Sequence, residues 1–431
     1  MRIIYPQVAG ALALLLAAAS VTLARPEAGP DPAKPQYGSN LTVWPNSVSK
    51  ANSDKWLVDN HDKISKMRPR VLVLNFSNGL PQEKAAKMAK QLCGALTEST
   101  RYHGYKDKNA RPFIEWQILK LVDLTDPAPY PETPDANSTK YPRVPNWKDG
   151  INFVYKELYG DKFAQYYGFK DPDKPGRFLH LDELVARGII HEVWFMAYQR
   201  NAGAPFECTE LKPVYDGNFK RVKDQFMPSG NGGDPGEPWH GRSLRISFIN
   251  SERGIGCNVE SLSHAFEGTS NSSVIPYLRK YFYEFGGFDL DKRYKLPFDS
   301  FYALWGEGKG IEYPDAHTAI VKDGSKEYRL ENYVAGGGNV HFTPNGRGHY
   351  DLESPATVMS TIEHYRLFDG PDGKDLAEPW TIAKFQRYRD LAPDCMGAWL
   401  VYWRQNLPGL ANKCKDDNGK PMKNWWPFLY Y

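Results

Sequence analysis

The chain has 431 residues, of which 41% are hydrophobic, 14% aromatic and 24% charged, with a formal net charge of +3. The hydrophobic content is ample for a folded core and excludes global disorder. The nearly neutral balance gives no basis for nucleic-acid binding, which requires a basic face. Abundant aromatic rings are typical of proteins that stack on sugars, and equally of large secreted folds with aromatic cores.

The N-terminus has the pattern of an export signal. Arg2 is its only early charge, residues 8–19 are apolar, and Thr22-Leu23-Ala24 fits a small-residue cleavage site. The apolar run is too short and too rich in alanine for a membrane anchor. We therefore predict a secreted or periplasmic protein, cleaved near Ala24 (residues 1–24), without stable membrane insertion. Residues 25–53 are Pro-rich and predict a linker.

Residues 54–272 predict a core domain of alternating strands and helices. Short apolar runs rich in β-branched residues indicate buried strands, and segments with helical spacing follow them. This order favours an α/β fold with a mostly parallel, doubly wound sheet, Rossmann-like or flavodoxin-like, with long loop insertions at 123–145 and 199–241. Ligands of such folds bind beyond the carboxyl ends of the strands. The predicted strands are 70–76, 113–122, 191–198 and 244–249, and the predicted helices are 82–100, 152–169 and 181–188.

Residues 273–431 have a looser pattern and are dense in Trp, Phe and Tyr near the end. We interpret them as an aromatic-rich C-terminal extension that packs on the core, over the carboxyl edge of the sheet, and completes the site.

The five cysteines allow at most two disulfides in an oxidising compartment. Cys395 and Cys414 flank one compact stretch and form our preferred pair, while Cys208 and Cys257 could link neighbouring loops. Cys93 lies on the apolar face of a predicted helix and is expected to be a buried free thiol.

The first candidate site follows the strand at 244–249. After a turn with Glu252 and Arg253, a predicted helix carries Glu260, His264 and Glu267 at positions i, i+4 and i+7, on one stripe. One interpretation is the solvated face of an amphipathic helix. The other is a stripe that faces the carboxyl-edge cleft, in which His264 and Glu267 share a metal ion.

A third metal ligand would come from His341 or His349, in a second block at residues 336–351. This HxxE and distant His arrangement is similar to the ligand set of zinc carboxypeptidases, although the rest of that family's pattern is not recognisable. The glycines of the block allow close backbone approach, and Asn345, Arg347 and Asp351 could hold substrate hydroxyls. The alternative is a glycine-rich loop with a structural histidine.

Three further residues are candidates for catalysis or binding. Glu252 could act as a general base on a bound water, and Glu207, after the third strand, could enter the same cleft. Arg253 could clamp an anionic or hydroxyl-rich substrate, or simply pair with Glu252 or Glu260. Carboxylates at 207, 252 and 267 also allow a glycosidase acid and nucleophile pair.

Four segments within residues 190–352 together resemble a family of secreted α/β proteins whose function is uncharacterised. They read HEVWFMAY, PFECTE, FINSERGIG with SLSHAFEG, and GGGNVHFTPNGRGHYD. In that family a strand ends in Glu-Arg-Gly, a helix carries Gly-His-x-x-Glu, and a later block reads Cys-Gly-x-Val-His-Phe-x-Pro-Asn before a Tyr-Asp. The chain departs from the pattern at Ser263, Gly337 and Cys257. The resemblance implies that both blocks belong to one site, and it implies no activity. The matching residues are Glu252, Arg253, Gly254, His264, Glu267, Val340, His341, Phe342, Pro344, Asn345, Tyr350 and Asp351.

Together these patterns predict an exported, metal-assisted hydrolase that acts on an extracellular glycan or peptide, with one divalent ion, zinc favoured, and no nucleotide cofactor. The alternatives are a metal-free carboxylate-pair glycosidase and a non-catalytic glycan- or wall-binding protein. The assigned residues are Glu252 and Glu207 for catalysis, Arg253, Asn345 and Asp351 for substrate binding, and His264, Glu267 and His341 for the metal.

Overall fold

The computed structural model describes residues 37–49, 53–130, 136–145, 152–203, 205–232, 236, 239 and 241–431. The predicted signal peptide and its cleavage site lie outside the described residues, as does about half of the predicted linker. Among the helices within these ranges, none has the length and apolar character needed to cross a membrane.

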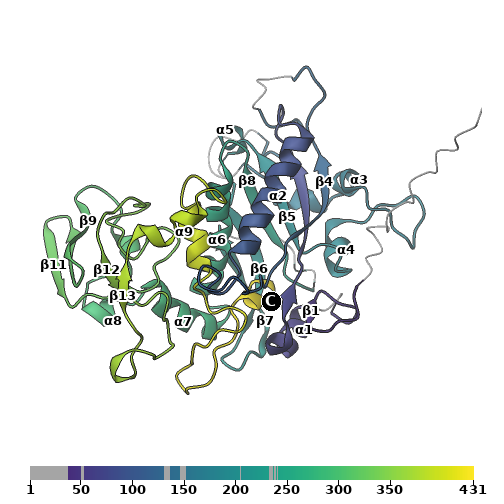
Figure 1. The fold of residues 1–431 in the computed structure, drawn as a ribbon. Helices are drawn as coiled ribbons and strands as arrows, with labels where there is room; N and C mark the ends of the chain where they lie inside the picture. Colours follow the sequence, from purple (N-terminus) through teal and green to yellow (C-terminus); the bar gives the residue numbers. More distant parts are fainter. Residues whose placement is uncertain are drawn as a thin grey trace, which may run out of the picture.

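A six-stranded sheet with the order β4-β3-β5-β8-β6-β7 forms the centre of the protein (Figure 1). Its parallel strands are β3 (Arg70–Asn75), β4 (Gln117–Asp123), β5 (Glu192–Ala197) and β8 (Arg245–Asn250). The predicted α/β class with a mostly parallel sheet is therefore confirmed. Because Asn75 pairs with Met196 and Ala197 pairs with Asn250, the carboxyl ends of three strands meet at one edge.

The prediction of one long loop at 199–241 was wrong. After the short helix α5 (Gln199–Ala202), this region forms the antiparallel hairpin of β6 (Cys208–Tyr215) and β7 (Arg221–Asn231) at the edge of the sheet. Its prolines obscured the pattern: Pro228 lies opposite Leu211, and Pro213 opposite Phe226. Proline is tolerated in a hairpin at the edge of a sheet. It lacks a backbone N–H, but an edge strand forms hydrogen bonds to a neighbouring strand on one side only.

Two hydrophobic clusters cover the two faces of the sheet. Val71, Val73 and Trp194 point to one cluster, where α2 (Gln82–Glu98) and α6 (Ile255–Asn271) pack. The alternate residues of the same strands point to the other, which holds α3 (Asp161–Tyr167) and α4 (Leu181–Ala186). Burial on both faces explains the unbroken apolar runs. The predicted helix at 152–169 is split, because the extended Gly160 separates η2 (Tyr155–Tyr159) from α3.

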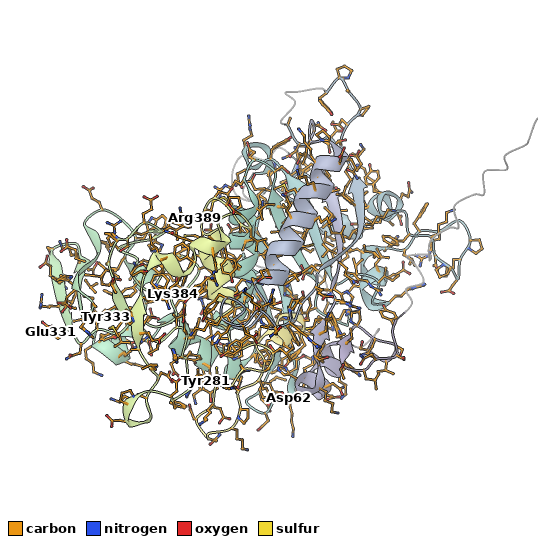
Figure 2. The ribbon with its side chains drawn as sticks, in the orientation of Figure 1. Asp62, Tyr281, Glu331, Tyr333, Lys384 and Arg389 are labelled. Atoms are coloured by element: carbon orange, nitrogen blue, oxygen red, sulfur yellow. A yellow bond between two sulfur atoms is a disulfide. The ribbon has the colours of Figure 1, made fainter. Side chains whose placement is uncertain are left out.

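The chain after α6 adds helices and small sheets beside the central sheet (Figure 1). Helix α9 (Gly397–Arg404) packs on α6, and α7 (Pro276–Gly286) packs on it as well. An antiparallel sheet of β9 (Lys309–Asp315), β10 (Thr318–Asp323) and β11 (Lys326–Glu331) was not predicted. Figure 2 shows Glu331 and Tyr333 at this outer end.

The remaining elements are short. They are β1 (Val43–Trp44), α1 (Ser53–Asn60), η1 (His61–Lys63), β2 (Lys66–Met67), α8 (Leu290–Tyr294), η3 (Phe301–Ala303), β12 (Val358–Ser360), η4 (Pro371–Gly373), β13 (Glu378–Trp380), η5 (Ile382–Lys384), η6 (Gln386–Tyr388) and η7 (Trp426–Tyr430).

The disulfide joins Cys257 to Cys395, so the predicted pair of Cys395 with Cys414 was wrong. The pairing follows from tertiary packing, since the segment before α9 lies against the start of α6. Cys414 and Cys208 are buried free thiols, and Cys93 is one as predicted.

A buried carboxylate joins the sheet to the C-terminal segment. Glu192 accepts hydrogen bonds from the indoles of Trp116 (3.0 Å) and Trp194 (2.9 Å) and from Tyr430 (2.5 Å), and it pairs with Arg245 (3.2 Å). Replacing Glu192 with alanine would remove one of the carboxylate partners of the buried Arg245. It would also leave the two indole N–H groups and the Tyr430 hydroxyl without their acceptor. We expect the free energy of unfolding to fall by about 3–5 kcal/mol in urea titrations.

The control for this prediction is Asp59→Ala, which removes an exposed i,i+4 pair with Lys55. Its cost should stay near 0.3–0.5 kcal/mol, roughly what such surface pairs contribute. Equal costs for the two variants would contradict the role of Glu192.

Candidate functional site

The helix that carries the candidate site, α6, is anchored at its first turn. The backbone N–H of Gly256 donates to the Pro393 carbonyl (3.0 Å), and that of Cys257 donates to Asp394 Oδ1 (3.2 Å). A carboxylate at this position satisfies free N–H groups and favours the positive end of the helix. With the Cys257–Cys395 disulfide, these contacts fix where α6 starts relative to the segment before α9.

Gly256 is required by this close approach. A Cβ on Gly256 would lie 2.2 Å from the Pro393 carbonyl oxygen and 2.3 Å from that of Asp394. We expect Gly256→Ala to lower the free energy of unfolding by about 1–3 kcal/mol, the usual cost of overpacking. The matched control is Gly94→Ala inside α2, where a Cβ meets nothing within 4 Å. Chemical denaturation should show that Gly94→Ala raises the free energy of unfolding by about 0.5–1 kcal/mol, because alanine is the better helix former.

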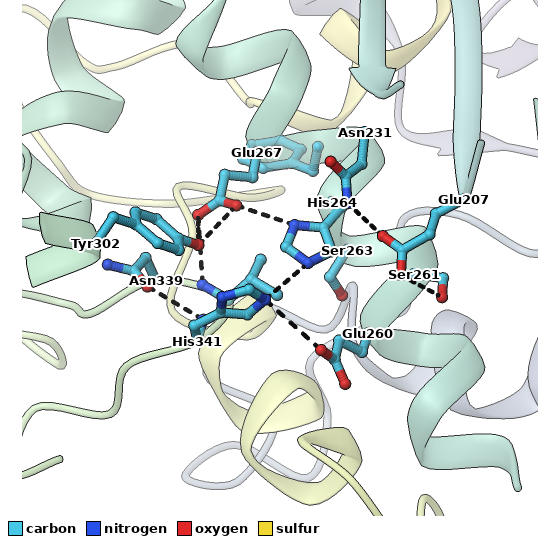
Figure 3. A network of polar contacts seen from close by, with 12 residues as sticks. Glu207, Asn231, Glu260, Ser261, Ser263, His264, Glu267, Tyr302, Asn339 and His341 are labelled. Carbon is cyan, nitrogen blue, oxygen red and sulfur yellow. Dashed lines mark hydrogen bonds and ion pairs between the residues drawn. The ribbon is translucent and has the colours of Figure 1, made fainter. Parts of the chain in front are cut away.

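The polar stripe of α6 is buried. Glu260, His264 and Glu267 are 8%, 7% and 5% exposed. The interpretation of this stripe as a solvated helix face is therefore wrong. His341 from the 336–351 block and Tyr302 from η3 contact it, so the two segments identified in the sequence meet at one place (Figure 3).

Glu267 contacts His264 at Nδ1, called its inner nitrogen here, while Nε2 is its outer nitrogen. Its Oε2 lies 3.1 Å from His264 Nδ1, and the Tyr302 hydroxyl donates to both of its oxygens (2.9 and 3.0 Å). The backbone N–H of Val340 lies 3.4 Å from the same carboxylate. A carboxylate on Nδ1 sets the tautomer and the ring orientation of a histidine, and it leaves the other nitrogen free to bind.

The outer nitrogens of two histidines face each other. His264 Nε2 lies 3.1 Å from His341 Nε2, and Glu260 Oε1 lies 3.7 Å from His341 Nε2. These three ligand atoms all lie within 4.8 Å of one another. Two ligands on one tetrahedral zinc ion are about 3.3 Å apart, given bonds of about 2.0–2.1 Å. The spacing therefore suits one small divalent cation, and a shared proton is the alternative that would satisfy both nitrogens.

The electrostatics of this cluster favour a cation. Burial opposes a charge on His264, but the hydrogen bond and charge of Glu267, together with Glu207 and Glu260, raise its pKa. Burial, helped by the charge of His264, lowers the pKa of His341 to about 3. Burial and the charge of Glu207 raise the pKa of Glu260 overall. Three carboxylates thus act on one imidazole, and a divalent ion would neutralise this excess of negative charge.

Glu207 reaches the cluster from the start of β6 (Figure 3). Its Oε1 accepts from the Ser261 hydroxyl (3.4 Å), and its Oε2 accepts from the Asn231 amide. The charge of Glu207 acts on His264 and Glu260 alike, so this carboxylate adds to the negative potential of the cluster.

The structure gives Glu252 a different surrounding from the one we expected. Its carboxylate binds Arg200, with Nε at 2.8 Å and the backbone N–H at 3.2 Å. Burial alone would raise the pKa of Glu252, but the bonds and charge of Arg200 lower it. A carboxylate of low pKa is a weak general base at neutral pH. Arg253 is exposed, and its charge acts on Glu260 and Tyr350.

The two predicted substrate residues of the second block are engaged within that block. The buried Asn345 amide donates to the carbonyls of Ser354 (3.2 Å) and Ala356 (2.7 Å). Asp351 binds the guanidinium of Arg347 (2.6 Å). Both side chains hold the loop that carries His341. His349, the other candidate ligand, packs against Phe342 and Trp305.

Two tyrosines at the site were not assigned from the sequence. Tyr302 supports Glu267, and the Tyr350 hydroxyl lies 2.9 Å from His341 Nε2. Tyr302 stands in an aromatic stretch without periodicity, so nothing in the sequence distinguished it. Tyr350 was visible only as part of a motif. Comparison of the chain with models of known protein families, with curated proteins and with solved structures gave no match.

Proposed function

We propose that the protein is a metal-assisted hydrolase in which Glu260, His264 and His341 hold one divalent ion, with zinc favoured. The observation that carries this proposal is the convergence of two imidazole nitrogens and one carboxylate oxygen within 4.8 Å, inside a cluster of negative charge. Glu267 takes the role of the carboxylate that orients His264, in place of the direct ligand role predicted from the sequence.

Zinc held by these three protein ligands would supply Lewis acidity and would lower the pKa of a bound water. The neighbouring residues then have defined tasks. Glu207, whose charge acts on both Glu260 and His264, is assigned to accept the proton of the attacking water. The Tyr350 hydroxyl donates to the oxygen that becomes negative as water adds to the substrate. We keep the substrate class as an extracellular glycan or peptide at this stage.

A carboxylate-pair glycosidase is the second candidate, and one observation favours it. Glu260 has a raised pKa, as a general acid requires, and Glu207 is the second carboxylate within electrostatic reach. This pair replaces the predicted pairs that included Glu252 or Glu267. The non-catalytic binding protein is the outcome if neither metal nor turnover is found.

The fold supports a finer proposal, a doubly wound, flavodoxin-like arrangement. The four parallel strands have the order β4-β3-β5-β8, and helices pack on both faces. In this order the connections diverge between β3 and β5, as they do in flavodoxin-like sheets. We retain the proposal of export, with which the disulfide is compatible.

The decisive experiment measures the metal content and activity of the purified protein. We expect elemental analysis to find one zinc ion per chain. We also expect the protein to hydrolyse a chromogenic ester, peptide or glycoside, and this activity should be abolished by chelator and restored by zinc. Glu207→Gln should retain the ion and lose activity. Full activity in chelator would overturn the metal-assisted reaction and leave the carboxylate pair.

The pH dependence of zinc affinity follows from the pKa shifts. Zinc requires neutral imidazoles, so it competes with the proton of His264, whose pKa is raised. Glu260, the third ligand, must also be ionised, and its pKa is raised as well. Affinity should therefore rise with pH through these two raised pKa values and level off above both. His341, with a pKa of about 3, should add no proton release near neutrality. Calorimetry below both raised pKa values should show release of two protons, one from His264 and one from Glu260, and the absence of any proton release would contradict this assignment.

A further inference from the structure

Trp305 is the most exposed large hydrophobic side chain among the described residues, at 62%. It follows η3, the same short helix that supplies Tyr302 to Glu267. An exposed indole places a large apolar face in contact with water. Aromatic surface exposed beside a polar cluster commonly marks a binding face.

The exposed ring is held in place by its neighbours. The Trp305 ring meets the edge of His349, with centroids 4.4 Å apart, and His349 packs in turn on Phe342. Tyr350 is 44% exposed, and its ring lies 6.1 Å from Trp305 and 4.4 Å from His341. Trp305 and Tyr350, the aromatic platform, thus extend from open surface to a candidate metal ligand. A ring ordered before binding loses little entropy when a ligand stacks on it.

Polar groups lie at the inner end of the platform. The Tyr350 hydroxyl lies 2.9 Å from His341 Nε2, which in turn lies 3.7 Å from Glu260 Oε1. The charges of Glu260, Glu207 and Arg253 all act on Tyr350. A ligand on the platform would therefore place one apolar face against the rings. Hydrogen-bonding groups at its rim would face the polar groups at the inner end of the platform.

We propose that the aromatic platform binds a pyranose ring of a glycan substrate. A pyranose has C–H groups across a flat face and hydroxyls around its rim, which matches stacking on Trp305 with hydrogen bonds to the polar groups at the inner end of the platform. This inference rests on the proposed function for the position of the bond that is cleaved, and it names the substrate class of that site.

The test is retention by insoluble cellulose, chitin and xylan, with gelatin beads as the peptide polymer. Wild-type protein is assayed both zinc-loaded and after chelator treatment. We expect retention by at least one polysaccharide, with the dissociation constant raised at least about tenfold in Trp305→Ala. Trp305→Phe, which keeps a smaller ring, should fall between these values.

The matched control is Phe368→Ala, since Phe368 is an exposed ring (38%) that packs beside Arg366 in another loop. It should bind as tightly as wild type. Retention by no polysaccharide, equal retention of wild type and Trp305→Ala, or retention by gelatin alone would each overturn the inference.

The two proposals can fail separately. Zinc binding without any polysaccharide retention would reject the glycan platform and leave the metal-assisted hydrolase. Trp305-dependent retention that persists in chelator, in a protein that binds no zinc, would reject the metal and support the platform.

Discussion

Replacing His264 with alanine is expected to reduce zinc from one ion per chain to none that survives gel filtration. His264 would supply one of the three proposed ligand atoms, and its Nε2 lies 3.1 Å from Nε2 of His341, the second proposed ligand. Two remaining ligands would leave the ion largely to water, far from the closed tetrahedral set that zinc prefers. Elemental analysis and competition with a chromogenic chelator would measure the loss, with circular dichroism to verify folding.

Two further variants distinguish the loss of a zinc ligand from weaker support of that ligand and from the loss of an unrelated histidine. Glu267→Gln keeps the ligand atoms but weakens the support of His264 Nδ1, so zinc affinity should fall by about 10- to 100-fold and not vanish. His317→Ala removes an exposed histidine from the turn after β9 and should bind zinc as the wild type does. Normal zinc content in His264→Ala would show that the ion, if any, is held elsewhere.

Removing the disulfide should produce the largest loss of stability. Cys257 and Cys395 are 138 residues apart, and closing a loop of this length restricts the unfolded chain by roughly 5 kcal/mol at 25 °C in the chain-entropy account. The double variant Cys257→Ser, Cys395→Ser should therefore unfold at markedly lower urea concentration. Zinc affinity should fall as well, because the bond anchors the first turn of the helix that carries Glu260 and His264.

Reductant provides the control for the disulfide. Dithiothreitol should lower the stability of the wild-type protein to about that of the double variant and leave the variant unchanged. The three remaining cysteines are buried free thiols, and they should not mask this difference. A wild-type protein that is as stable in reductant as without it would contradict the prediction.

Local spacing in the sequence was sufficient to identify the segments of the candidate site, but not the position of each residue in it. The i, i+4, i+7 spacing placed Glu260, His264 and Glu267 on one stripe, and the structure buries that stripe. Which carboxylate faces the outer nitrogen of His264 depends on the rotation of α6 against the 336–351 block. The structure directs Glu267 to Nδ1 and brings Glu260 near His341.

Several errors have the same physical origin. The Cys257–Cys395 bond joins distant segments, and its formation depends on the packing of the segment before α9 against the start of α6. Glu252 is at the strand end as expected, but Arg200, 52 residues earlier, binds it. The β6–β7 hairpin was hidden because proline at a sheet edge resembles proline in a loop.

The sequence by itself determined the α/β class, the mostly parallel sheet, the buried Cys93 thiol and the two segments that meet at the candidate site. These features depend on hydrophobic periodicity and burial, which each segment carries locally. Only the tertiary structure decided the edge hairpin, the disulfide, the partner of Glu252 and the grouping of Glu260 with His264 and His341. Those depend on contacts between residues far apart in the chain, whose geometry is set by how the helices pack on the sheet.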